Sequence, residues 1–360
     1  MRVVDLFAGL GGMSQGAIMA GAEVIEVYDN DPVPLKLLGA NVPGVKVHLT
    51  TLGPTGDAIF LPPPVPDLHV HASTPCTELS PAKYNASQND VATGVRMLEW
   101  ALDLFIGRGE CSWSLENVST PTTRKVLADY KSRFPDKVDF ATLDAADFGA
   151  PQTRVRLIAA PPRLIKLLQQ MPSARRVSVR EAFSAAGLEV AADAFKNQTR
   201  NRDGTPCLRS VEEQSFTVCA SHALTWCNRE GKTLRVMNAK ESAVLMGFTP
   251  NWRLPTGSRT GQRAVGNALC VSMSTAIAQA AIAIYTDEPV PLPPLTAIPP
   301  ITPSMPPAPP EPSLTAMPAV TLLEADTTTH TMPRGSRKIS KRLKSIEALL
   351  RGLHEPQLAR

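Results

Sequence analysis

The chain has 360 residues and a net charge of +4 at pH 7; 43% of its residues are hydrophobic and 19% charged, a balance typical of globular proteins with a buried core. No run of 18 apolar residues occurs, and the N-terminus lacks a signal peptide's basic region and cleavage site. We therefore expect no membrane span and a location inside the cell, in cytoplasm or nucleus. The six cysteines include no C-x-x-C pair, which excludes a zinc ribbon, and we expect no metal.

Short apolar runs alternate with helical stretches over the first 160 residues. Strands are predicted over 1–8, 23–28, 45–49, 67–72, 112–115, 138–142 and 155–159, and helices over 13–21, 32–40, 90–107 and 121–133. Strands that alternate with helices predict an α/β fold, in which a mostly parallel sheet carries helices on both faces. We assign residues 1–160 to the first part of this domain.

The alternation fades between residues 161 and 235, where a smaller subdomain is predicted. This segment carries 12 Lys and Arg against 7 Asp and Glu. Such positive charge suits a phosphate backbone, although a solvated basic face is an equally open interpretation. Helical patterns return at 238–247 and 264–284, so residues 236–285 are expected to rejoin the first domain.

The C-terminal part of the chain is rich in proline and then in basic residues. Residues 289–333 hold 14 of the 34 prolines, which predicts a disordered or polyproline linker over 286–335 that could bind another protein. The tail, 336–360, is basic, and residues 337–353 within it resemble an amphipathic helix. It could anchor nucleic acid or a partner, or it could be a solvated tail that is helical only part of the time.

A glycine-rich turn follows the first predicted strand. Residues 5–12 read Asp-Leu-Phe-Ala-Gly-Leu-Gly-Gly, and a helix starts directly after them. Glycines let the backbone approach a ligand closely, and a helix N-terminus offers free amides. Asp31, after the second strand, can accept hydrogen bonds from a ribose. This pattern indicates a nucleotide-like cofactor, and a turn without a ligand is the alternative.

Four further side chains stand at strand ends, where open α/β sheets bind ligands. Cys76 follows the strand at 67–72, and Glu116 follows the strand at 112–115. Arg154 and Arg156 alternate along a strand and so share one face, where they could hold an anionic group. Each has an ordinary alternative: a buried thiol, a surface carboxylate and a salt-bridged arginine pair.

Taken together and in this order, these patterns resemble the cytosine-C5 DNA methyltransferase family. The matching segments are 7–12, 75–76, 116–118, 152–156, 243–248 and 266–268, within residues 1–285. The resemblance implies a Rossmann-like S-adenosylmethionine-dependent methyltransferase fold with a small target-recognition subdomain at 161–235. It also implies that the cofactor site is lined by Phe7, Gly9, Gly11, Gly12, Asp31 and Asn267.

The same resemblance assigns the chemistry. Cys76 adds to C6 of cytosine, which makes C5 nucleophilic enough to take the methyl group from S-adenosylmethionine. Glu116 holds or protonates N3, while Arg156, with Arg154 nearby, holds the base oxygen and positions Glu116. The expected substrate is double-stranded DNA with the target base flipped out, and the enzyme is expected to be monomeric.

The sequence departs from the family at the nucleophile loop, where Thr74 and Thr77 replace the usual proline and glutamine, and at Pro32, where a larger residue is common. These changes bear on cofactor affinity more than on the type of reaction. A tRNA cytosine methyltransferase of the same fold and a catalytically inactive nucleic-acid-binding relative remain the alternatives. An NAD-dependent oxidoreductase would leave Cys76 and Glu116 unexplained.

Overall fold

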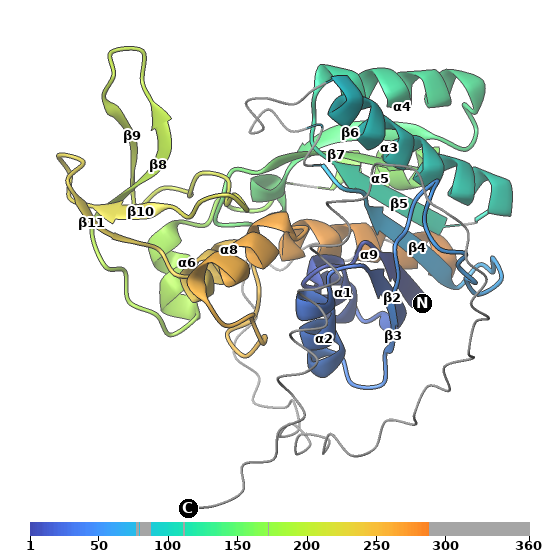
Figure 1. Ribbon diagram of the computed structural model, residues 1–360, viewed down its shortest axis with the longest axis horizontal. Coiled ribbons are helices and arrows are strands. Elements are labelled where there is room, and N and C mark those ends of the chain that lie inside the picture. The colour runs from blue at the N-terminus through green and yellow to red at the C-terminus, as the bar shows by residue number, and fades with distance from the viewer. Residues whose placement is uncertain (77–78, 80–87, 111, 172, 288–360) are drawn as a thin grey trace, which may run out of the picture. The chain divides into compact units, whose positions relative to one another are not determined.

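A seven-stranded mixed sheet forms the centre of the computed structural model, which describes residues 1–76, Leu79, 88–110, 112–171 and 173–287 (Figure 1). The strand order is β3-β2-β1-β4-β5-β7-β6, and only β7 among these strands runs antiparallel to its neighbours. The strands are β1 (Arg2–Leu6), β2 (Glu23–Asp29), β3 (Lys46–Leu49), β4 (Leu68–Ser73), β5 (Ser112–Asn117), β6 (Asp139–Asp144) and β7 (Val155–Ala160). The predicted α/β methyltransferase fold is therefore confirmed.

Helices cover both faces of this sheet, each over its own apolar core. The helices are α1 (Gly12–Met19), α2 (Pro32–Asn41), α3 (Gln88–Arg108), α4 (Pro121–Arg133), α5 (Pro162–Gln170) and α9 (Val271–Thr286), with a 3-10 turn at Ala145–Phe148. One core joins Val3 of β1 to residues of α1, α5 and α9, and the other joins Val4 to residues of α3 and α4. Successive β1 side chains thus enter opposite layers, as strand geometry requires.

The part of the chain between β7 and residue 239 forms a second, four-stranded antiparallel sheet. Its order is β11-β10-β8-β9, from β8 (Ala194–Arg200), β9 (Pro206–Ser210), β10 (Thr225–Cys227) and β11 (Thr233–Val236), and α6 (Val179–Ala185) packs beside it. Trp226 is fully buried, with Phe183 and Phe195 edge-on to its ring at 5.6 and 6.2 Å. These aromatic contacts supply the small sheet's own core. Helix α5, although within 161–235, packs against β6, β7 and α9 of the large sheet.

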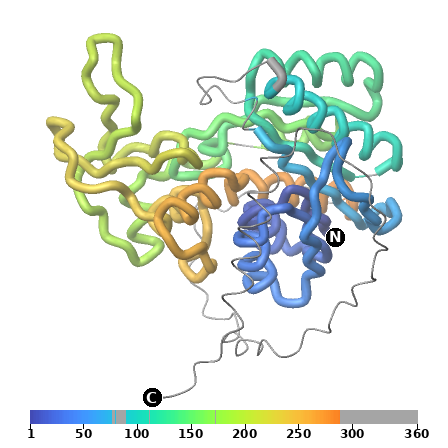
Figure 2. The backbone as a smooth tube through the Cα atoms, in the orientation of Figure 1, coloured from blue at the N-terminus to red at the C-terminus, as the bar shows by residue number. Residues whose placement is uncertain are grey.

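The chain returns to the large sheet through α7 (Ala239–Leu245), α8 (Ser258–Asn267) and α9 (Figure 2). The single helix expected over 264–284 is broken between α8 and α9. The break has a physical cause, because Gly266 lies against the backbone of Cys219 and Ala220, and the carbonyls of Gly266 and Ala268 bond to Arg154 instead of continuing a helix.

The segment Ser258–Thr286 is apolar enough to cross a membrane by length and composition, with a mean hydropathy of 1.6. However, 67% of its most apolar window is buried inside the protein, and α9 packs along α1 and α5 (Figure 1). Burial of this kind identifies a core helix. The expected proline-rich linker beyond Asp287 and the basic tail lie outside the described residues.

Candidate active site

The nucleophile loop leaves the carboxyl end of β4, and Cys76 is its last residue before the gap at 77–78. The side-chain amide of Asn117, the last residue of β5, donates to the Thr74 hydroxyl at 2.8 Å and to the Thr74 carbonyl at 3.3 Å. Both Asn117 and Thr74 are buried. The threonine that replaces the usual proline is therefore the residue that ties this loop to β5; Thr77 lies outside the described residues.

Glu116 and Arg156 form an ion pair beside this loop. The Arg156 Nε lies 2.9 Å from a Glu116 carboxylate oxygen, and both side chains are largely buried. Glu116 belongs to β5 itself rather than to the loop after it, and its neighbour in the sheet is β7, which carries Arg156. A partly buried, charge-assisted contact of this kind fixes the orientation of the carboxylate.

The Cys76 thiol lies in an environment with opposing effects on its ionisation. Burial raises its pKa, the nearby negative charge of Glu116 raises it further, and the Arg156 and Arg154 guanidiniums lower it. The thiol is half-buried and free. Cys76 therefore lies within electrostatic reach of the three charged residues that the sequence grouped with it, and its thiolate needs help to form.

Arg154 has a different environment from Arg156. Its guanidinium donates to the carbonyls of Val218, Gly266 and Ala268 at 2.8–3.1 Å, and it is only 2% exposed. Burial lowers its pKa to about 10. The two predicted arginines therefore have different contacts. Arg156 contacts the Glu116 carboxylate, whereas Arg154 links the segment before β10 to the break between α8 and α9.

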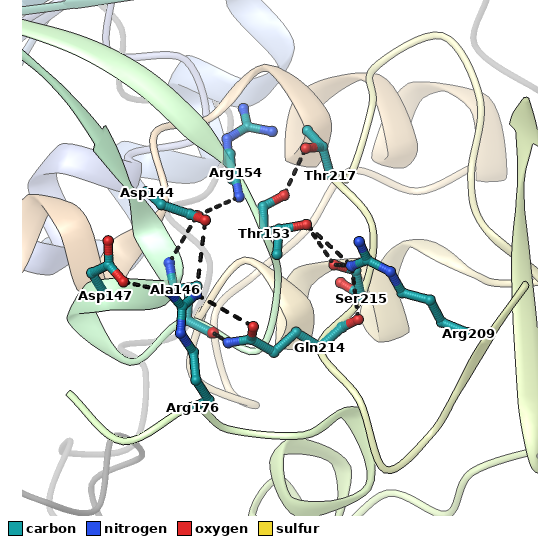
Figure 3. Close-up of polar contacts among 11 residues, drawn as sticks. Asp144, Ala146, Asp147, Thr153, Arg154, Arg176, Arg209, Gln214, Ser215 and Thr217 are labelled. Carbon is teal, nitrogen blue, oxygen red and sulfur yellow. Dashed lines mark hydrogen bonds and ion pairs between the residues drawn. The ribbon is translucent and has the colours of Figure 1, made fainter. Parts of the chain in front are cut away.

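Polar contacts also fix the backbone on either side of Arg154 (Figure 3). Its amide donates to Asp144 at 2.8 Å, and its guanidinium points away from that carboxylate. The preceding residue, Thr153, accepts at its carbonyl from Thr217, and Arg209 donates to the Thr153 hydroxyl and the Ser215 carbonyl. This network connects the start of β7 to the four-stranded sheet.

The glycine turn after β1 combines backbone strain with close packing. Phe7 has a φ of +58°, which is unusual for a side chain of its size, and its ring contacts Trp100 edge-on at 5.9 Å. A side chain on Gly12 would lie 2.1 Å from the Leu269 carbonyl, and one on Gly11 would meet Leu38. Around Gly9, by contrast, the space is open. Packing explains Gly11 and Gly12, whereas Gly9 faces free space.

Asp29, which sequence reasoning missed, lies closer to this turn than Asp31 does. Asp29 ends β2 and accepts the Gly9 amide at 2.8 Å, and burial raises its pKa. Asp31 instead caps α2 by accepting the Val33 amide and pairs with Arg263 at 2.9 Å. The position in the sequence could have indicated this, because Asp29 is the last residue of the strand whereas Asp31 lies two residues beyond it.

Asn267, the remaining predicted cofactor residue, is the last residue of α8, and its side chain is exposed. Asp5 is a second residue that sequence reasoning did not single out as a site. It is buried in β1 below the glycine turn, where Ser14 donates to one carboxylate oxygen and the other has no partner. Burial raises the Asp5 pKa to about 7.

The geometry places a thiol, a fixed carboxylate and a glycine turn at the carboxyl ends of three neighbouring parallel strands, β4, β5 and β1. The profile of the C-5 cytosine-specific DNA methylase family matches residues 1–283, which is more than three quarters of the chain. The chain belongs to this family. It is a DNA (cytosine-5-)-methyltransferase, so the main interpretation of the sequence is confirmed.

Relatives agree with this assignment. The chain is 24% identical over 302 residues to type II methyltransferase M.HindV of Haemophilus influenzae, a match that covers 78% of this chain and 96% of the relative. It is 22% identical over 308 residues to type II methyltransferase M.HgiDI of Herpetosiphon aurantiacus, covering 80% and 96%. This C5 methyltransferase therefore spans nearly the full length of both relatives.

Solved structures share the fold. A putative DNA modification methyltransferase from an Escherichia coli prophage matches with a TM-score of 0.53 at 17% identity and covers 80% of this chain and all of its own. The Entamoeba histolytica methyltransferase EhMeth matches with a TM-score of 0.53 at 13% identity, covering 79% and 98%. At these sequence identities the structural similarity supports the fold of this C5 methyltransferase alone.

Proposed function

We propose that this C5 methyltransferase works through Cys76, Glu116 and Arg156, with S-adenosylmethionine as the methyl donor. The observation that carries the proposal is the Arg156–Glu116 ion pair at 2.9 Å, whose two charges also act on the Cys76 thiol. A nucleophile, a carboxylate and an orienting cation are the three groups that C5 chemistry on cytosine needs.

Each residue has a separate role in this proposal. Cys76 adds to C6 of the base as a thiolate, and Glu116 donates a proton to N3, so electron density builds at C5. Arg156 holds the Glu116 carboxylate and the base oxygen. After methylation a water molecule acts as the base that takes the C5 proton, the C5–C6 double bond re-forms as the thiolate leaves, and N3 returns its proton to Glu116.

The residues around the glycine turn fit the cofactor that the family implies. S-adenosylmethionine supplies an electrophilic methyl group on a positively charged sulfur. Asp29, with its carboxylate beside Gly9, offers acceptors for a ribose, and Phe7 presents a ring for the adenine. The unpartnered oxygen of Asp5 is buried and would be stabilised by a ligand with positive charge. Asn267, exposed at the end of α8, remains a candidate contact.

DNA is the substrate that the family implies, and we assign its recognition to the small sheet. Four exposed cations lie at the ends of these strands: Arg200 ends β8, Arg202 follows it before β9, and Arg229 and Lys232 lie between β10 and β11. Exposed cations on two adjacent hairpins suit a phosphate backbone. The target cytosine has to leave the helix to reach Cys76, since the carboxylate and thiol lie in a largely buried site.

Trapping on DNA that carries 5-fluorocytosine tests the proposal, because fluorine at C5 blocks release of the cysteine. Wild-type protein with S-adenosylmethionine should form a denaturant-stable complex, and Cys76→Ser should form none. Cys219→Ser, another half-buried free thiol, is the matched control and should trap as wild type does.

Three results would contradict the proposal. Trapping by Cys76→Ser at the wild-type rate would remove Cys76 as the nucleophile. Wild-type protein that binds DNA without methylating or trapping it would favour the inactive relative. Transfer of labelled methyl groups to tRNA rather than to DNA would contradict the choice of substrate.

A further inference from the structure

The two central strands of the large sheet carry a row of polar residues on one face. In β4 the row is His69, His71 and Ser73, and in β5 it is Ser112, Ser114 and Glu116. The register pairs them side by side, His69 with Ser112, His71 with Ser114 and Ser73 with Glu116. Buried parallel strands are normally apolar on both faces, so this row is unusual.

Hydrogen bonds join five of these residues into one continuous column. His69 bonds through Nδ1 to Ser112 Oγ and through Nε2 to Ser114 Oγ, both at 2.8 Å. His71 bonds through Nδ1 to the same Ser114 hydroxyl at 2.7 Å and through Nε2 to Ser73 Oγ at 2.9 Å. Both histidines and Ser114 are fully buried, and every ring nitrogen is engaged.

The column can hold its protons in two equivalent ways. Burial lowers the pKa of both histidines to about 3, so each ring is neutral, with one N–H donor and one acceptor nitrogen. Ser114 accepts from one ring and donates to the other. All four hydrogen bonds can therefore point toward Ser73 or all toward Ser112, and moving one proton along each bond converts one arrangement into the other.

The two ends of the column lie at opposite edges of the sheet. Ser73 ends β4 beside Glu116, its partner in the register. Ser112 is the first residue of β5 and is buried, with 6% of its surface exposed, at the amino end of the strand. The column thus runs from the amino end of β5 to Ser73, whose register partner on the next strand is Glu116.

We propose that Ser112, His69, Ser114, His71 and Ser73 form a proton relay that exchanges the carboxyl proton of Glu116 with solvent at the amino edge of the sheet. The inference rests on the proposed role of Glu116. A proton that enters at Ser112 shifts one proton along each bond, and Ser73 passes its own to Glu116. The reverse sequence removes it, and no other bond changes.

The chemistry gives the relay a purpose. The ion pair with Arg156 requires an ionised Glu116, whereas donation to N3 requires a protonated one. Bound DNA and cofactor would close the carboxyl edge while this proton has to be supplied. Within the part of the chain that the structure describes, Arg156, Arg154 and Cys76 are charged or titratable groups near Glu116, and Asp5 of β1 is paired in register with His71. In this proposal the five column residues act through Glu116 and are positioning residues.

Interrupting the middle of the column tests the relay. Ser114→Ala removes the hydroxyl that both histidines share, and His69→Gln keeps a hydrogen-bonding side chain that cannot exchange tautomers. Ser114→Thr restores the hydroxyl. Ser242→Ala is the matched control. Ser242 is also a buried serine, its hydroxyl donates to Gln262, and it lies outside the column.

The readouts are single-turnover methylation across pH 6–9, in mixtures of H2O and D2O, together with KM for DNA and the thermal unfolding midpoint. General acid–base catalysis raises reaction rates by about 10²–10⁴-fold. We therefore expect kcat to fall at least about tenfold in Ser114→Ala and His69→Gln, with KM for DNA unchanged. The wild-type rate should depend nonlinearly on the deuterium fraction because several protons move together, and both variants should lose this curvature. Ser114→Thr should regain rate and curvature.

Folded Ser114→Ala or His69→Gln protein with the wild-type rate and curvature would overturn the relay. An equal loss of rate in Ser242→Ala would also overturn it, by showing that loss of any buried hydroxyl has this effect. Failure of the relay remains distinct from failure of the proposed function, because wild-type protein that neither methylates nor traps DNA would refute the latter before any relay variant is compared.

Discussion

The side-chain amide of Asn117 donates to the hydroxyl of Thr74 at 2.8 Å, across two strands whose ends carry the carboxylate and the thiol. Asn117 follows Glu116 directly, and Thr74 lies two residues before Cys76. One hydrogen bond thus links the loop that carries Cys76 to the strand that carries Glu116. It also explains how this chain tolerates a threonine where its family usually has proline.

Replacement of Thr74 by valine keeps the shape and removes the hydroxyl, leaving the buried Asn117 amide with only its longer contact to the Thr74 carbonyl. An under-satisfied buried donor costs about 1–3 kcal/mol, so the free energy of unfolding should fall by about 1 kcal/mol and covalent trapping should slow. Urea denaturation and trapping rates measure both. Thr74→Ser should behave like wild type; equal losses in both variants would contradict a role for the hydroxyl.

The opposed charges around Cys76 predict opposite effects on its thiolate. Glu116→Gln removes a negative charge that raises the Cys76 pKa, so alkylation by iodoacetamide at pH 8 should be faster than in wild type. Arg156→Gln removes a positive charge that lowers this pKa and should slow alkylation. Mass spectrometry of the Cys76 peptide follows the rate, with Arg163→Gln as a surface control. Changes of the same sign in both active-site variants would refute this electrostatic arrangement.

Asp29 and Asp31 differ sharply in their expected effect on the cofactor. Asp29→Asn alters the carboxylate beside Gly9 and should weaken S-adenosylmethionine binding by about tenfold, the equivalent of 1.4 kcal/mol. Asp31→Asn preserves an N-cap side chain and should change affinity less than about twofold. Isothermal titration calorimetry measures both constants. A larger loss in Asp31→Asn would restore the ribose role to that residue.

Asp5 should make the protein less stable as pH rises. Burial raises its pKa in the folded state from 3.8 to about 7, so the folded protein binds more protons than the unfolded chain between those values, and stability falls across that window. Above pH 7 the deficit is on the order of 4 kcal/mol. Asp5→Asn should remove this fall in urea titrations run from pH 4 to 8; parallel pH profiles for the two proteins would count against it.

Local patterns were sufficient to predict the order of the strands and helices along the first 160 residues, because alternating and helical periodicities carry that information. The break before α9 could not be read in the same way. It depends on Arg154, which directly precedes β7 and lies more than a hundred residues earlier in the chain, donating to the carbonyls of Gly266 and Ala268. Small apolar residues on both sides of the break look like one continuous helix.

The site shows the same division. Cys76, Glu116 and Arg156 could be predicted from short segments, since Cys76 follows β4, Glu116 lies near the end of β5 and Arg156 near the start of β7. The column through His69 and Ser114 was invisible, because it exists only once β4 and β5 are paired in a particular register. Long-range pairing, rather than any local pattern, creates such features.

Gly12 has consequences for how the protein is made. Its Cα lies against the Leu269 backbone so closely that no methyl group would fit, and its carbonyl accepts from Ser274, 262 residues further along the chain. The turn leaves the ribosome early, but it cannot acquire these native neighbours until α9 has been synthesised. A chain that terminates before α9 would therefore lack the contacts that close the glycine turn, however much of the sheet it contains.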